Sequence, residues 1–383
     1  MWKTLTMLLL AALLAPPIAG AVPTVSVGTC LPQYAHFSTI SAAVTAIPPG
    51  GVILVCPGVY PEQVVISKPL TLHGQSINNA DRPVVAVPTT ASGGSGLTVN
   101  TSSSILPWLF AAQVLVQNVT PPGPVKISNL TVDGAGGNLG CPGGSTMVAG
   151  IFYASGTTGS VQEVTARNQQ NSGCGIGIWV QNDTAPSQSI ILSSNSTHDF
   201  DGFGIAAVGV PSMLSITMSG NFVTGNGPVG DIVAANVTGT ISKNVVTGGF
   251  FGIRDWETGP YENSQSPGVT ISNNSVGDIT DPSGMGIIIR EGSTASSNQL
   301  SNVTTAFYLN GGSTANPGPI LLANTIKNTA VAVEYNCTAN TTWKSNTIND
   351  AQLAYADFPS GFIISNGVNP LYNVDTIAAS SCP

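Results

Sequence analysis

Short apolar segments recur along this chain, and each is followed by a polar turn. In the stretch 269–292, VTISNNSVGDITDPSGMGIIIREG, two apolar segments flank an Asn pair and a turn rich in Gly and Asp. Short apolar segments bounded by turn residues are typical of buried strands. The stretch therefore has the length of one coil in a ladder of stacked strands.

The same unit repeats over most of the chain. One polar residue follows the first strand segment of each unit, at Asn129, Glu163, Asn195, Asn221, Asn244, Asn274, Asn298, Asn324 and Asn346. Self-similarity at such a period is typical of a solenoid. Stacked coils place equivalent residues about 4.8 Å apart. We therefore expect the Asn side chains to form a hydrogen-bonded column and the Ile and Val side chains to form apolar columns.

The two ends of the repeat differ from its middle. Residues 37–47 carry apolar side chains at a helical spacing, with Ser38 as a candidate N-cap and the sequence PPGG as a stop. We expect a short capping helix there, regular coils over residues 125–365, and a C-terminal cap at 366–383. Caps are needed because the end coils of a solenoid expose unpaired strand edges.

Residues 37–74, FSTISAAVTAIPPGGVILVCPGVYPEQVVISKPLTLHG, resemble the opening of secreted bacterial β-helix proteins of the pectate-lyase-like superfamily. The likeness lies in the capping helix, the strand after it and the pattern PGxYxExVxIxKPLTLxG. It implies an all-β fold, a right-handed parallel β-helix, in which Glu62 has a turn or solvent-facing role. Enzymes of this superfamily act on polysaccharides in a groove along one long face.

The catalytic segments of the better known members do not recur here. Neither the Gln-Asp nor the Asp-Phe-Ile-Phe-Gly segment of pectinesterases occurs, and HDFD at 198–201 is only faintly similar to the Asp-Pro-His-Glu of alginate epimerases. Calcium-site motifs of lyases are not evident either. The resemblance thus implies the fold and leaves the activity open.

The N-terminal residues have the layout of a cleavable secretory signal. Lys3 precedes an apolar run from Leu5 to Leu14, and small residues follow at 19–21. We expect residues 1–21 to be removed and residues 22–383 to form a single domain, which is secreted, periplasmic or at the cell surface. A membrane span needs about 20 apolar residues. We therefore expect the mature chain to have none, and to be a monomer.

The amino-acid composition limits the kinds of partner and metal site that the chain can have. Only 7% of the residues are charged and the net charge is -8, which argues against nucleic acid as a partner. The six cysteines of an exported chain predict disulfides, and neighbours in sequence pair most simply, as Cys30–Cys56, Cys141–Cys174 and Cys337–Cys382. Three His and no Cys/His motif argue against a zinc site.

Charged and aromatic residues gather on neighbouring units between residues 178 and 292. If Ile178, Ile253 and Ile287 face the core, alternation points Trp179, Arg254, Trp256 and Arg290 outward and Asp255 inward. We identify as candidate catalytic residues Asp199, Asp201, Asp231, Arg254 and Arg290. The candidate substrate-binding residues are Trp179, Trp256, Glu257, Tyr261 and Glu291.

Two interpretations of this group remain open. Carboxylates on adjacent coils have about the spacing that glycosidases use, whereas a lyase would use an Arg as base and acids that bind Ca²⁺; the Trp rings would be platforms for sugars. The chain then binds or cleaves a polysaccharide. In the other interpretation it is a non-catalytic, adhesin-like surface protein, whose acids are turn formers and surface partners of Arg254 and Arg290. The second interpretation is favoured if the acids lie on different faces.

Overall fold

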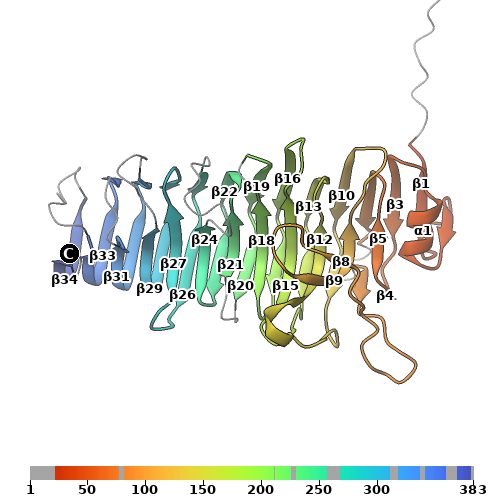
Figure 1. The fold of residues 1–383 in the computed structure, drawn as a ribbon, viewed down its shortest axis with the longest axis horizontal. Coiled ribbons are helices and arrows are strands. Elements are labelled where there is room, and N and C mark those ends of the chain that lie inside the picture. Colours follow the sequence, from red (N-terminus) through yellow and green to blue (C-terminus); the bar gives the residue numbers. More distant parts are fainter. Residues whose placement is uncertain are drawn as a thin grey trace, which may run out of the picture.

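The chain forms an elongated stack of coils with a strand on each of three faces (Figure 1). The computed structural model describes residues 22–76, 82–210, 212–225, 230–256, 268–310, 318–336, 341–358 and 369–380. Successive coils pair through parallel strands, as in the pairs β13–β16 and β15–β18. The predicted fold class, a right-handed parallel β-helix, is confirmed.

Face 1 is a sheet of 13 strands. Its members are β1 (Thr24–Val27), β2 (Ala35–Phe37), β3 (Gly51–Val55), β6 (Leu70–Gly74), β10 (Pro124–Ser128), β13 (Thr158–Gln162), β16 (Gln188–Ser193), β19 (Leu214–Ser219), β22 (Thr238–Ser242), β25 (Val269–Ser272), β28 (Thr294–Ser296), β30 (Ile320–Leu322) and β32 (Thr342–Lys344).

Faces 2 and 3 follow face 1 within each coil. Face 2 holds β4 (Val59–Pro61), β7 (Val84–Ala86), β11 (Thr131–Asp133), β14 (Thr165–Arg167), β17 (Ser196–His198), β20 (Phe222–Gly225), β23 (Val245–Gly248) and β26 (Ser275–Ile279). Face 3 holds β5 (Val64–Ile66), β9 (Leu109–Val116), β12 (Thr146–Tyr153), β15 (Gly175–Asn182), β18 (Phe203–Gly209), β21 (Gly230–Ala235), β24 (Phe251–Trp256) and β27 (Met285–Arg290). In the last coils one strand serves both faces: β29 (Gln299–Asn310), β31 (Thr325–Glu334), β33 (Thr347–Ala356) and β34 (Leu371–Ala379).

The interior is filled by columns of aliphatic side chains in register. On face 3 the column runs from Ile178 through Ile205, Ile232 and Ile253 to Ile287, and every member is fully buried. Each coil alone cannot bury its apolar side chains, so stacking supplies the core. The inward direction that was predicted for these Ile residues is confirmed.

An asparagine ladder runs along the corner between faces 1 and 2. Each Asn from Asn195 to Asn324 donates its side-chain N–H to the side-chain oxygen of the Asn on the next coil, over 2.8–3.0 Å, and also to a main-chain carbonyl. The ladder continues through Asn346 to Asn369, whose side chain accepts from the Asn346 backbone. From Asn195 to Asn346 the predicted polar column is therefore buried and its side-chain N–H groups are hydrogen-bonded.

The predicted register of the first two rungs is wrong by one residue. Asn129 and Glu163 have positive φ values, 54° and 56°, and occupy the left-handed corner position that precedes the ladder. Leu130 and Val164 take the ladder position and are buried. Asn readily adopts the left-handed conformation and therefore occurs at the corner as well as in the ladder. For this reason Asn129 at the corner was mistaken for a ladder residue.

A short helix, α1 (Ile40–Ala46), lies at the N-terminal end of the stack (Figure 1). Its N-cap is Thr39, not Ser38, since the Thr39 side chain accepts from the Ala42 backbone. The Glu62 carboxylate accepts from the backbone N–H groups of Ile40 and Ser41, at 2.7 and 2.9 Å. Glu62 thus holds the helix start in place, a structural role more specific than the turn or solvent role expected.

The coils extend further than predicted at both ends. β3 and β6 already stack below β10, and β34 pairs with β33 in the segment predicted to be a C-terminal cap. Two segments leave the stack between faces 2 and 3: residues 87–108, which include β8 (Thr101–Ser102), and residues 134–145, which include a 3₁₀ turn at Pro142–Gly144.

Two of the predicted disulfides are present. Cys30 is bonded to Cys56, and Cys141 to Cys174. Cys337 and Cys382 lie outside the described residues, as do residues 1–21 with the predicted signal. In the part of the chain that is described, no helix is long and apolar enough to cross a membrane.

Candidate functional site

The outer surface of face 3 carries the aromatic candidates, but its first half is covered. Trp179 on β15 is only 1% exposed and contacts Trp108, with 5.6 Å between the ring centroids. Trp108 belongs to the segment 103–109, which lies on β12, β15 and β18 through Ile105, Leu106 and Trp108 itself. The prediction of Trp179 as an open sugar platform is therefore wrong, because a distant part of the chain packs onto it.

Arg254 and Trp256 lie further along the same surface and point outward as predicted. Both are partly exposed, and the Arg254 guanidinium carbon lies 3.4 Å from the centroid of the Trp256 ring. Burial lowers the pKa of Arg254 to about 10, so the guanidinium still carries its charge at neutral pH. Its Nε atom has no hydrogen-bond partner among the described residues. The pair is a cation–π stack in which the unpaired Nε atom is buried.

Asp231, at the start of β21, is not on the outer surface. It is 1% exposed, and its carboxyl group lies against Gly225 and Gly249 at the corner between faces 2 and 3. Burial raises the pKa of Asp231 well above its ordinary value, and its Oδ2 atom has no hydrogen-bond partner in the described parts of the chain. A carboxyl group buried inside the coil cannot reach a polysaccharide, so the structure contradicts the outer-surface position expected of this catalytic candidate.

Arg290 is also buried, contrary to the prediction. Its Nε donates to Oδ1 of Asp255 over 3.1 Å, and Ser293 donates to the other carboxylate oxygen. Burial raises the pKa of Asp255 to about 6, although the charge of Arg290 opposes this. Asp255 points inward as expected, and Arg290, which ends β27, turns over it at the corner. Alternation fails for Arg290 because the strand ends there.

Asp199 and Asp201 lie at the corner between faces 2 and 3. Asp201 accepts from the backbone of Asn171 and Gly175, at 2.8 and 2.7 Å, and so braces the turn of the preceding coil. Asp199 has a left-handed φ of 55°, is about half exposed and lies 2.6 Å from Nδ1 of His198. Asp201 thus has a structural role, whereas Asp199 is accessible as part of a His–Asp pair.

The remaining candidates add little to this surface. Glu291 is partly exposed at the end of β27. Glu257 and Tyr261 lie outside the described residues. The acids proposed as catalytic therefore do not share one face, and among the candidates that the structure describes, Arg254 and Trp256 lie together on the exposed part of face 3. Among the described residues no group of three His, Cys, Asp or Glu side chains is placed to hold a metal ion, and the binding of Ca²⁺ stays a prediction.

A second group on this surface was missed from the sequence. Ile288 pairs with Arg254, Tyr308 with Ile288, and Glu334 with Tyr308, so these residues form one outward row over four coils. Glu334 in turn pairs with Ala356, the residue before Asp357. Tyr308, Glu334 and Asp357 are therefore close neighbours, and all three are partly exposed.

Tyr308, Glu334 and Asp357 are close enough to influence one another electrostatically. Burial raises the pKa of Glu334, the negative charge of Asp357 raises it further, and a hydrogen bond with Thr305 opposes this. Burial and the charges of Glu334 and Asp357 likewise raise the pKa of Tyr308. A carboxyl group with a raised pKa beside a second carboxyl group is an arrangement that suits general acid catalysis. The sequence alone did not indicate this group. Its three residues come together only through the pairing register of the strands, and no Asp-rich or Gly-rich motif marks them.

A groove lies elsewhere, at the corner between faces 2 and 3 of the last coils. It has a volume of about 600 Å³ and is lined by Asp278, Asn302, Asn328, Asp350 and Asn373. These side chains bond to one another along the stack, as Asn302 does to Asp278 over 3.0 Å. They stabilise left-handed corner residues. The groove is a consequence of the corner and holds no aromatic side chain.

Comparisons with known proteins indicate the fold alone. No family model matches the chain, and no curated protein matches its sequence. Among solved structures, DFA-IIIase from Arthrobacter chlorophenolicus A6 without its lid is 16% identical, with a TM-score of 0.50 over 87% of this chain and 84% of that one. The mannuronan C-5 epimerase A-module of Azotobacter vinelandii is 13% identical, with a TM-score of 0.46 over 90% and 91%. A family 28 exopolygalacturonase of Yersinia enterocolitica is 11% identical, with a TM-score of 0.47 over 94% and 79%. At this identity the match to DFA-IIIase indicates a likeness of fold alone.

Proposed function

We propose that this protein binds a polysaccharide on the outer surface of face 3 and hydrolyses a glycosidic bond there. The observation that carries the proposal is the pair Glu334 and Asp357, which lie on adjacent coils of that surface. Two carboxyl groups with different protonation states are what glycoside hydrolysis requires. Glu334, with its raised pKa, is the general acid, and Asp357 is the carboxylate that acts as base or nucleophile.

The other residues of the row suit substrate binding. Trp256 supplies an apolar ring beside the positive charge of Arg254, and the two lie about 10 Å from Tyr308, which is two coil spacings. Aromatic rings bind the apolar faces of sugars. A sugar chain along the axis would thus reach both the stack and the carboxyl pair.

Activity on glycans tests the proposal. The purified protein is incubated with neutral and uronate polysaccharides, with and without Ca²⁺, and products are identified by mass spectrometry. Hydrolysis products are expected, and Glu334→Gln and Asp357→Asn should each lower kcat by about 10² to 10⁴. Trp256→Ala should raise KM more than it lowers kcat. Glu163→Gln is the matched control, because Glu163 is exposed at another corner and should leave both constants unchanged.

The result that contradicts hydrolysis is specific. Products that carry an unsaturated sugar would indicate elimination by a lyase, and rates that are equal in wild type and Glu334→Gln would exclude Glu334 as the acid. The absence of products from every glycan, together with no retention on any of them, would contradict the whole proposal.

A non-catalytic, adhesin-like role is the second candidate. The scattered positions of three acids favour it. Asp199 lies at a corner, Asp201 accepts hydrogen bonds within a turn, and Asp231 lies in the interior. In that case the protein would bind a glycan or a surface without turnover. Binding that survives Glu334→Gln with no product from the wild type would support it.

A further inference from the structure

Arg167 and His198 lie side by side on the outer surface of face 2, away from the site proposed above. β14 and β17 pair in register, so Arg167 is opposite His198 and Thr165 is opposite Ser196. The residue between them in each strand is buried, so these four side chains point outward. These four residues therefore start from neighbouring positions, about 4.8 Å apart across the two strands and about 6.6 Å apart along each strand.

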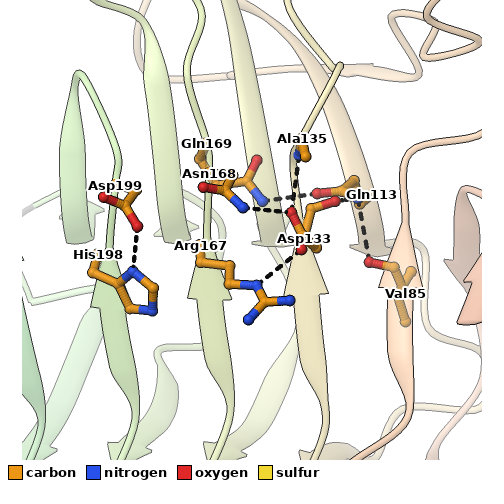
Figure 2. A network of polar contacts seen from close by, with 9 residues as sticks. All are labelled: Val85, Gln113, Asp133, Ala135, Arg167, Asn168, Gln169, His198 and Asp199. Atoms are coloured by element: carbon orange, nitrogen blue, oxygen red, sulfur yellow. Dashed lines mark hydrogen bonds and ion pairs between the residues drawn. The ribbon is translucent and has the colours of Figure 1, made fainter. Parts of the chain in front are cut away.

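Each of the two nitrogen-bearing side chains is fixed from one side by a carboxylate. Arg167 Nε donates to Oδ2 of Asp133 over 2.8 Å, and Nδ1 of His198 lies 2.6 Å from Oδ2 of Asp199 (Figure 2). Asn168 and the Ala135 backbone also donate to Asp133. Burial raises the pKa of Asp133, but these hydrogen bonds and Arg167 outweigh it and lower the pKa below its ordinary value. The anchor of Arg167 thus stays ionised.

The opposite ends of both side chains are uncommitted. Neither the terminal guanidinium nitrogens of Arg167 nor Nε2 of His198 has a hydrogen-bond partner within the described parts of the chain, and the two side chains are 41% and 35% exposed. In Figure 2 both project from the same side of the sheet, and the imidazole leans toward the guanidinium. An arginine held through Nε presents its two remaining nitrogens to a ligand as a pair, which matches a carboxylate or a sulfate.

We infer that Arg167, His198, Thr165 and Ser196 form a second binding site, which takes an oxyanion group with a neighbouring hydroxyl, as in a carboxylated or sulfated sugar. Arg167 binds the oxyanion. His198, oriented through Nδ1 by Asp199, uses Nε2 for the hydroxyl, and the two small hydroxyl side chains complete the contacts. The site is independent of the carboxyl pair on face 3.

Titration calorimetry with glucuronate, glucose 6-sulfate and glucose tests this inference on the full chain. One or both charged sugars should bind, glucose should not, and Arg167→Gln should weaken binding about tenfold or more. His198→Gln and Ser196→Ala should each give a smaller loss. The matched control is Lys126→Gln, which removes an exposed positive charge from face 1 and should leave affinity unchanged.

The two charged sugars distinguish a carboxylate ligand from a sulfate ester, and the variants test whether the site exists. Binding of glucuronate alone assigns a carboxylate, and binding of the sulfate alone assigns a sulfate ester. No binding of either sugar, equal affinity in Arg167→Gln, or an equal loss in Lys126→Gln would overturn the site. Because Glu334→Gln should bind these sugars as the wild type does, failure here is distinguishable from failure of the proposed hydrolysis.

Discussion

Asp255 and Arg290 form an ion pair inside the solenoid, with 3.1 Å between Oδ1 and Nε and side chains that are 0% and 3% exposed. The pair joins β24 to the end of β27, and Ser293 completes the contacts of the carboxylate. Removal of one member of a buried pair leaves the other charge uncompensated. Replacement of both is better tolerated.

Arg290→Met should therefore lower the free energy of unfolding by about 3 to 5 kcal/mol. The double variant Asp255→Asn with Arg290→Met should recover part of this loss, because no buried charge remains. Urea denaturation followed by circular dichroism measures both. Lys126→Met at the surface is the control, and a loss of equal size in that variant would show that the pair is not responsible.

The stability of the fold should depend on pH through Asp231. Its pKa is raised by burial in the folded chain, whereas in the unfolded chain it titrates near the ordinary value of about 3.9. The folded state therefore holds the proton more tightly, and this contribution to stability is full below pH 4 and is lost as the pH rises. Asp231→Asn should flatten that decline. Thermal midpoints between pH 4 and 9 that fall equally in both proteins would contradict the assignment.

The asparagine ladder should be more sensitive in its middle than at its end. Asn274→Ala leaves the backbone and side-chain N–H groups of Asn244 and the Ile241 carbonyl without their partner. At about 1 to 3 kcal/mol for each buried unpaired group, the loss should be at least about 3 kcal/mol. Asn195→Val should cost less, because the coil below already has Val164 at the ladder position. Equal losses in urea denaturation would show that position in the ladder does not matter.

The third disulfide is open to a direct test. Cys30–Cys56 and Cys141–Cys174 account for four of the six cysteines, which leaves Cys337 and Cys382. Peptide mapping by mass spectrometry without reduction should find these two linked if the chain is exported to an oxidising compartment, as its N-terminus predicts. Free thiols at both positions in the secreted protein would contradict the pairing.

The repeat predicted the fold because it is a local signal. Period, Asn columns and inward Ile residues follow from residues within one coil, and the stacking of coils then repeats the same contacts. The register of Asn129 and Glu163 was missed because a corner residue and a ladder residue are adjacent and chemically alike. For Glu62 only a turn or solvent-facing role was expected, since its partners lie on a helix more than 20 residues away in sequence.

The sequence by itself determined the architecture, two disulfide pairs and the outward direction of Arg254 and Trp256. Only the tertiary structure decided accessibility: Trp179 is covered by residues 103–109, Asp231 is buried, and Arg290 turns inward at the end of its strand. It also brought Tyr308, Glu334 and Asp357 together from three coils. Alternation along one strand determines whether a side chain leaves the backbone toward the core or toward the outside. The residues that the side chain then contacts come from distant segments, and these contacts depend on strand register and on the paths of the loops.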